Sequence, residues 1–268
     1  MIKEVKVTSG FAANLPCLKD KIEFKPGLNV LFGPNGCGKS TTLKIMGAYC
    51  GIKGGGWSRF PDPLDLKRGV GESIKKTKLP DAFKGLSPAG CEAKVIWDGT
   101  PSFLNHSGND NPMATVFFES ADESPDGMTD MHEQIGLMMG KPSEGQLRIH
   151  KLRKVLEIAL KPPDLTKIPD RMVNDTWKEG WTIFAKYVSK LDRTGPATLL
   201  LDEPDKSLSI ENQIMFWKDI IPKMSTKLQL IVASHSPFCI NVKANFIDMQ
   251  NGYLEETRKA VHSFMETK

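Results

Sequence analysis

Apolar, β-prone runs recur along the chain and end in glycine, acidic or small polar residues. The first is Leu28 to Phe32, entered from a Pro26-Gly27 turn, and others lie in PATLLLDEP (Pro196 to Pro204) and LQLIVASHSP (Leu228 to Pro237). A helical pattern at Ile210 to Ile221 separates the last two. Continuous apolar strands that alternate with helices are typical of parallel sheets buried on both faces. The pattern therefore predicts an α/β core.

A further set of runs predicts an antiparallel layer beside this core. Ile2 to Val7 and Ile22 to Phe24 have the composition of short strands. Ala93 to Asn105 holds β-prone runs on either side of Asp98-Gly99, which is a hairpin signal, and Met113 to Ser120 forms another strand-like run. Ile2 to Val7 and Ile22 to Phe24 are expected only as strands that lead to the Pro26-Gly27 turn, whereas we expect Ala93 to Asn105 and Met113 to Ser120 to form the antiparallel layer.

The middle of the chain predicts loops and helices. Gly51 to Gly90 is rich in Gly, Pro and Lys, which favours long loops. Ser143 to Leu160 is predicted as a helix with Ser143 as its N-cap, and another helical face collects apolar residues: Trp177, Trp181, Phe184, Val188 and Leu191. We expect a single domain over residues 1–268, with its core at about 1–50 and 190–268 and a β and helical insert at about 51–189.

Composition and charge exclude few classes of protein. The chain has 268 residues, a net charge of +4 and 5 scattered cysteines without a CxxC pair. This pattern suits reduced thiols, so we expect no disulfide and no structural metal. The start, MIKEVKVTSG, has no signal-peptide pattern, and no apolar run reaches the roughly 18 residues of a membrane span. We expect a cytoplasmic protein without membrane insertion.

The stretch GPNGCGKST follows the first apolar run and matches a phosphate-binding loop. Gly33, Gly38, Lys39 and Ser40 fill the G-x-x-x-x-G-K-[ST] positions. Backbone N–H groups can point at phosphates, the lysine can reach the β and γ phosphates, and the serine hydroxyl can ligate Mg²⁺. The candidate nucleotide-binding residues are Gly33, Pro34, Asn35, Gly36, Cys37, Gly38, Lys39, Ser40 and Thr41. Cys37 is either a redox-sensitive thiol or a small residue that fills its position.

The segment LLLDEP distinguishes a hydrolase from other phosphate-loop proteins. Asp202 ends an apolar run, where it is suited to hold Mg²⁺ through water, and Glu203 can polarise an attacking water. A kinase does not need that glutamate. In ASHSP, His235 lies at the tip of the next predicted strand, where it can sense or hold the γ-phosphate. We therefore expect Glu203 and His235 as catalytic residues and Ser40 and Asp202 as magnesium ligands.

PSEGQ, Pro142 to Gln146, opens the helix predicted in the middle of the chain. It places Ser143, Gly145 and Gln146 at a helix N-terminus, which either binds a further anion or only caps the helix.

The set GPNGCGKST, PSEGQ, LLLDEP and ASHSP, in this order, resembles the ABC-type ATPase fold, and is most similar to its RecF/SMC-related soluble branch. The resemblance implies an α/β P-loop NTPase with a mixed central sheet, an antiparallel β layer and a helical lobe that carries the signature motif. It also implies ATP and Mg²⁺ as cofactors and an ATP-dependent homodimer. In that dimer the PSEGQ helix of one subunit caps ATP on the other, and hydrolysis opens the pair.

Several positions depart from the family pattern. Pro142 and Glu144 replace a leucine and a glycine of the LSGGQ-like signature, and Ser209 occupies the position of the D-loop aspartate. No clear Q-loop glutamine is present, and Glu119 is our candidate for that position. The chain also lacks the heptads of SMC-type proteins and a nuclease segment after His235, so we expect a head domain that acts on a separate effector protein.

Three functions remain open from the sequence. A DNA-linked ATPase of repair or phage-conflict type is favoured by basic residues on the PSEGQ helix and at Lys75 to Lys78, although such charges also suit a solvated face. The nucleotide-binding subunit of a membrane transporter is disfavoured by the altered D-loop and Q-loop. An ATP-gated scaffold with little turnover would follow if the altered signature impairs hydrolysis.

Overall fold

A computed structural model describes residues 1–50, 91–97, 116–120, 196–206 and 208–266, together with positions 152, 160, 178 and 182. Within this part of the chain, no helix has the length and apolarity needed to cross a membrane. PSEGQ itself, the Trp177-containing face and the Asp98-Gly99 turn lie outside the described residues, whereas Leu152 and Leu160, from the helix predicted at Ser143 to Leu160, are described and helical.

The described elements are strands, α-helices and short 3₁₀ or π-helical turns. They are β1 (Ile2–Ser9), η1 (Phe11–Asn14), η2 (Pro16–Leu18), β2 (Ile22–Glu23), β3 (Leu28–Phe32), α1 (Lys39–Tyr49), β4 (Glu92–Trp97), β5 (Val116–Ser120), β6 (Thr198–Asp202), α8 (Ile210–Met215), η5 (Phe216–Ile220), α9 (Ile221–Ser225), β7 (Gln229–Ser234), η6 (Cys239–Asn241), β8 (Asn245–Asp248) and α10 (Tyr253–Glu266).

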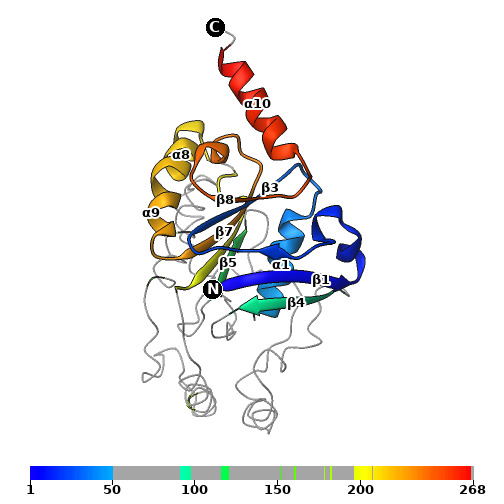
Figure 1. The fold of residues 1–268 in the computed structure, drawn as a ribbon. Helices are drawn as coiled ribbons and strands as arrows, with labels where there is room; N and C mark the ends of the chain where they lie inside the picture. Colours follow the sequence, from blue (N-terminus) through cyan, green and yellow to red (C-terminus); the bar gives the residue numbers. More distant parts are fainter. Residues whose placement is uncertain are drawn as a thin grey trace, which may run out of the picture.

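A parallel sheet forms the centre of the molecule (Figure 1). Its strand order is β5-β6-β7-β3-β8, and each described pairing within it is parallel. Every residue of β3, β6 and β7 is buried, which confirms the prediction from their continuous apolar runs. Because these strands are neighbours and parallel, their carboxyl ends meet at one edge of the sheet.

Antiparallel pairing is found in a second sheet, with strand order β2-β1-β4. β4 belongs to an antiparallel layer as expected, and β1 and β2, which were predicted as strands without an assigned partner, complete it. The other strand expected in this layer does not belong to it. Val116–Ser120 pairs parallel with Thr198–Asp202 and forms the edge of the central sheet. That part of the prediction was wrong because a short apolar strand has the same pattern in either kind of sheet, so its pattern does not determine its partner.

Side chains alternate between the faces of the central sheet and build a core on each. Leu31, Leu200 and Ile231 pack toward α1 and the antiparallel sheet, in a cluster with Leu43 and Met46. The intervening positions of the same strands pack on the opposite face, against η5, α9 and α10: Val30, Phe32, Leu199, Leu201, Leu230 and Val232. This sandwich holds the carboxyl edge of the sheet in place.

The helix predicted at Ile210 to Ile221 exists, but its middle is a π-helical turn. α8 continues through η5, which is π-helical, into α9, so helical structure runs to Ser225. β8 and α10 were not predicted. In Figure 1, α10 extends away from the sheet, toward the C-terminus.

Candidate functional site

The phosphate loop connects the buried strand β3 to helix α1. Gly36 and Gly38 have φ angles of 79° and 105°, which favour glycine, and these turns bring the chain back into α1 at Lys39. An added Cβ at Gly38 would lie 2.9 Å from Leu15 Cδ1, whereas one at Gly36 would meet nothing within 4 Å. Lys39 and Ser40 therefore lie in the first turn of α1, where backbone N–H groups lack helical partners.

Lys39 is held against the loop itself. Its ammonium donates to the carbonyl oxygens of Gly33, at 2.7 Å, and Pro34, at 2.9 Å. The side chain is buried, with an exposed fraction of 5%. A buried ammonium within a loop of this shape is suited to bind phosphate oxygens, since a charged donor makes stronger hydrogen bonds than a neutral one.

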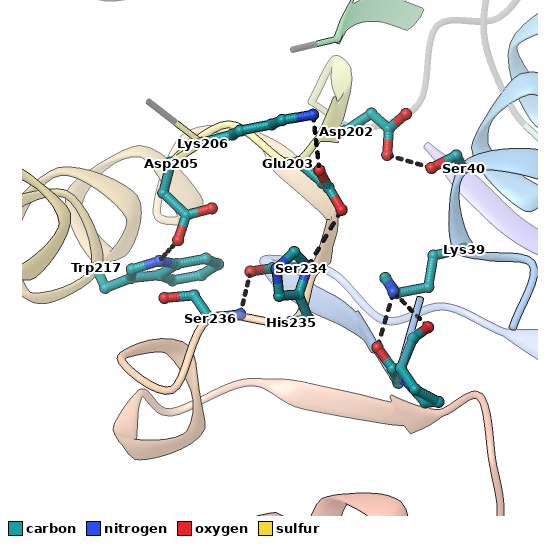
Figure 2. Close-up of polar contacts among 12 residues, drawn as sticks. Lys39, Ser40, Asp202, Glu203, Asp205, Lys206, Trp217, Ser234, His235 and Ser236 are labelled. Carbon is teal, nitrogen blue, oxygen red and sulfur yellow. Dashed lines mark hydrogen bonds and ion pairs between the residues drawn. The ribbon is translucent and has the colours of Figure 1, made fainter. Parts of the chain in front are cut away.

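Ser40 and Asp202 bring the loop and the acidic strand end together. The Ser40 hydroxyl donates to Asp202 Oδ1 at 2.8 Å, across a sequence separation of 162 residues (Figure 2). Asp202 is the last residue of β6, and its exposed fraction is 6%. Hydroxyl and carboxylate oxygens are hard ligands that suit Mg²⁺, which usually takes few protein ligands and keeps waters and phosphate oxygens. The described residues contain no cluster of three or more His, Cys, Asp or Glu suited to a metal, so these two oxygens fit that kind of site better than an all-protein cage.

Glu203 adopts an unusual backbone conformation directly after this strand. Its φ of 48° is the one positive value at a non-glycine position within the described residues. The Glu203 amide donates to the Ala233 carbonyl at 2.9 Å, which anchors the turn to β7. Strained backbone at a single residue is often found at functional positions, where the surrounding structure maintains it.

The Glu203 carboxylate faces the end of the neighbouring strand. His235 Nδ1 lies 3.1 Å from Glu203 Oε1, and Lys206 Nζ lies 3.8 Å from Oε2 (Figure 2). The glutamate side chain is 19% exposed and that of His235 is 48% exposed. Asp202 thus ends β6, Glu203 and His235 follow the adjacent strands β6 and β7, and all three lie beside the loop that follows β3.

The structure brings together part of the predicted site. Lys39, Ser40, Asp202, Glu203 and His235 lie at one edge of the sheet. Pro34, Asn35, Gly36 and Cys37 form the loop, and Thr41 lies in the first turn of α1. The signature residues Ser143, Gly145 and Gln146 lie outside the described residues. Glu119 pairs with Leu201 through the backbone of β5, and its side chain is also outside them.

Other polar residues near the site were not predicted. Lys206 contacts Glu203, and Asp205 accepts a hydrogen bond from Trp217 Nε1 at 2.7 Å. In the loop after β7, the Ser236 amide donates to Ser234 Oγ at 3.0 Å. Asp205 and Lys206 directly follow DEP in the sequence, so this charged pair could have been recognised there. Trp217 comes from an apolar helix face, and its sequence context does not indicate a contact with Asp205.

Cys17 contacts the loop from the 3₁₀ turn η2. Its thiol donates to the Cys37 carbonyl at 2.8 Å. Burial, and secondly the neighbouring Cys37, raise the pKa of Cys17 to about 11. The thiol therefore remains protonated and acts as a hydrogen-bond donor that supports the loop.

Comparisons with known proteins match the phosphate-loop segment to one family. A family model described as an AAA domain matches residues 15–63, a segment that includes β3, the phosphate loop and α1. No curated protein matches the chain. Among solved structures, the chain is similar to one described as a metal-chelate type ABC transporter in an inward-facing conformation, with 16% identity and a TM-score of 0.38, over 98% of this chain and 90% of the other. The family match covers the phosphate loop and agrees with a nucleotide-binding site there.

Proposed function

We propose that this protein binds ATP with Mg²⁺ and hydrolyses it at the carboxyl edge of the central sheet. The observation that carries the proposal is the 2.8 Å hydrogen bond between Ser40 and Asp202. It joins the phosphate loop to the acidic strand end, and Glu203 follows directly with its carboxylate beside His235. The AAA-domain match over the loop agrees with this assignment.

Each part of the site has a separate role in the proposed reaction. The loop amides and Lys39 bind the phosphates, and Ser40 and Asp202 hold Mg²⁺, which neutralises charge on the phosphate oxygens when bound. Glu203 orients a water molecule and accepts its proton as the γ-phosphate is attacked. His235, 3.1 Å from the Glu203 carboxylate, holds that carboxylate in place. The proposal also gives His235 the role of sensing the γ-phosphate.

Binding can be tested separately from turnover. Lys39→Ala removes the charged donor, so we expect ATP affinity to fall about 10- to 100-fold in calorimetric titration. Lys94→Ala is a matched control, because Lys94 is an exposed lysine of β4 in the second sheet. Equal affinity of the Lys39→Ala and Lys94→Ala proteins would refute phosphate binding by Lys39.

We further propose that the active form is an ATP-dependent homodimer in which PSEGQ of one subunit caps ATP on the other. Support comes from the order of the motifs in the sequence, with Ser143, Gly145 and Gln146 at the start of a predicted helix. The site described above is completed in this arrangement by residues from a second chain.

The proposed biological role is a DNA-linked ATPase that drives or gates a separate effector, in DNA maintenance or phage conflict. Support comes from the basic residues of the PSEGQ helix, Arg148, His150, Lys151, Arg153 and Lys154. Replacing Lys151, Arg153 and Lys154 by Ala should weaken DNA binding in the ATP state and reduce its salt dependence. Unchanged binding, equal to that of a Lys6→Ala, Lys94→Ala control, would show that this helix does not contact DNA.

A further inference from the structure

Asp205 is a buried acid that the proposed chemistry does not use. It lies two residues after Glu203 and has an exposed fraction of 5%. Within the described residues, no Lys or Arg forms an ion pair with it, and its carboxylate accepts the indole N–H of Trp217 at 2.7 Å. Burial of a carboxylate raises the free energy of the folded protein unless hydrogen bonds replace the lost hydration. The Trp217 hydrogen bond supplies part of that replacement for Asp205.

Trp217 is itself fixed by its surroundings. Its exposed fraction is 1%, and its ring packs edge to face on Phe216, with centroids 5.6 Å apart. Both residues belong to the π-helical turn η5, between α8 and α9. Single π-helical turns within helices occur frequently at functional sites. The indole is therefore a rigid donor aimed at the loop that carries Glu203 (Figure 2).

Glu203, the residue with the positive φ, lies between the Asp205–Trp217 contact and the central sheet. On one side, the Glu203 amide donates to the Ala233 carbonyl at 2.9 Å. On the other side, the Lys206 amide donates to the Glu203 carbonyl at 3.1 Å, and Asp205 is bound to Trp217. A left-handed conformation at a non-glycine residue persists only where neighbouring contacts hold it. Loss of the Trp217 contact would let the turn relax and move the glutamate.

We propose that Asp205 and Trp217 are a positioning pair that holds the Glu203 turn, so that the Glu203 carboxylate stays beside His235 in the orientation needed for hydrolysis. The pair acts through Glu203 and does not touch the nucleotide. The inference rests on the proposed function, because it assigns the pair a role in the same reaction.

Kinetics separate positioning from simple structural support. Trp217→Phe removes the N–H donor and keeps a large ring, and Asp205→Leu removes the acceptor. Each should lower kcat about 10- to 100-fold, as expected for a misplaced catalytic group, with the ATP dissociation constant within about twofold of wild type. Asp205→Asn keeps an acceptor oxygen and should retain most of the activity. The double variant Asp205→Leu, Trp217→Phe should be no slower than the worse single variant.

Gln229→Leu provides a matched control for lost stability. It removes another buried hydrogen-bonding side chain, whose contacts are to Ile2, Lys25 and Thr198 rather than to the Glu203 turn. It should lower Tm while kcat, measured well below Tm, stays at the wild-type value. A Trp217→Phe protein with wild-type kcat, or one whose ATP affinity falls as much as its kcat, would overturn the proposal.

Hydrogen–deuterium exchange gives a readout that does not need turnover. Trp217→Phe and Asp205→Leu should speed amide exchange in the segment from Glu203 to Leu208, and Gln229→Leu should not do so selectively. If exchange in this segment is unchanged, the claim that Asp205 and Trp217 hold the Glu203 turn is refuted, even if wild-type protein proves inactive. By contrast, turnover that is insensitive to Glu203→Gln, together with faster exchange in Trp217→Phe, would refute the proposed function and leave the positioning contact established.

Discussion

At the scale of single residues, the backbone of the phosphate loop depends on glycine for two different reasons. Gly36 and Gly38 both have positive φ, which disfavours any side chain. Only Gly38 is also crowded, because an added Cβ would lie 2.9 Å from Leu15 Cδ1 and 3.2 Å from Cys17 Sγ. The two glycines therefore allow strain and crowding to be measured separately.

We predict that Gly36→Ala lowers the free energy of unfolding by about 1 kcal/mol through backbone strain alone. Gly38→Ala should cost about 2 kcal/mol or more, since overpacking adds to the strain. Denaturant unfolding of both variants measures the difference. Equal losses would contradict the crowding of Gly38 by Leu15 and Cys17.

The Cys17 thiol provides a second test of how η2 supports the loop. A pKa of about 11 in place of 9.0 leaves roughly 100-fold less thiolate at pH 8. Alkylation of Cys17 by iodoacetamide, followed by mass spectrometry, should be correspondingly slow in the folded protein and fast in denaturant. Because the folded pKa is raised, the stability from the protonated thiol is present below pH 9 and is lost as the pH rises through about 11. Equal alkylation rates in the folded and unfolded chain would contradict the buried hydrogen bond to Cys37.

At the scale of elements, a buried amide joins the two sheets. Gln229, the first residue of β7, accepts from the Ile2 amide at 2.8 Å and donates to the carbonyls of Ile2, at 2.7 Å, and Lys25, at 3.1 Å. Its Oε1 also accepts from the Thr198 hydroxyl at 2.6 Å. One side chain thus satisfies backbone groups of β1 and of the segment before β3.

Replacing the Gln229 side chain should lower the stability of the fold. Gln229→Leu leaves buried N–H and C=O groups without partners, so we expect the free energy of unfolding to fall by about 2 to 3 kcal/mol. Gln250→Leu, at an exposed glutamine, is the matched control. If denaturant unfolding gives the same stability for both variants, the amide does not hold the sheets together.

The sequence predicted those elements whose own pattern defines them. Leu28–Phe32 was predicted with its observed bounds, and β6 and β7 lie within the predicted runs, because a buried parallel strand is a continuous apolar run. Their order in the chain also placed Asp202, Glu203 and His235 at strand ends. Ser40 and Asp202 could be paired in advance because both belong to known motifs.

Other features depend on contacts that no local pattern carries. Val116–Ser120 pairs with a strand that is distant in the sequence, and the π-helical turn at Phe216–Ile220 lies within a helical pattern that shows no break. β8 is short and half-buried, so its own pattern is weak, whereas α10 was missed although Tyr253, Leu254 and Val261 form an apolar face with helical spacing that packs on the core. The Asp205–Trp217 contact joins a loop to an apolar helix face and is visible only in the fold.

At the scale of the whole molecule, the proposed dimer makes a prediction about mixed variants. Lys39→Ala and Gly145→Asp should each be inactive alone, since the first loses the loop charge and the second places a carboxylate against the γ-phosphate. When the two chains are mixed, one site of the mixed dimer has an intact loop and an intact signature. Partial phosphate release should therefore return.

A mixture of Lys39→Ala with Glu203→Gln is the matched control. Both changes affect the site that each chain carries itself, so no intact site can form and the mixture should stay inactive. If Lys39→Ala and Gly145→Asp also fail to complement, and light scattering finds the ATP-bound Glu203→Gln protein monomeric at micromolar concentration, the head-to-tail dimer is excluded.

The central claim is that Glu203 activates water for ATP hydrolysis, and phosphate release by the Glu203→Gln protein tests it most directly. The amide keeps the size of the side chain and cannot accept the proton, so turnover should fall about 100-fold or more while ATP binding persists. Glu211→Gln, the same change at an exposed acid of α8, should release phosphate at the wild-type rate. Phosphate release by Glu203→Gln that equals the Glu211→Gln rate would contradict the account.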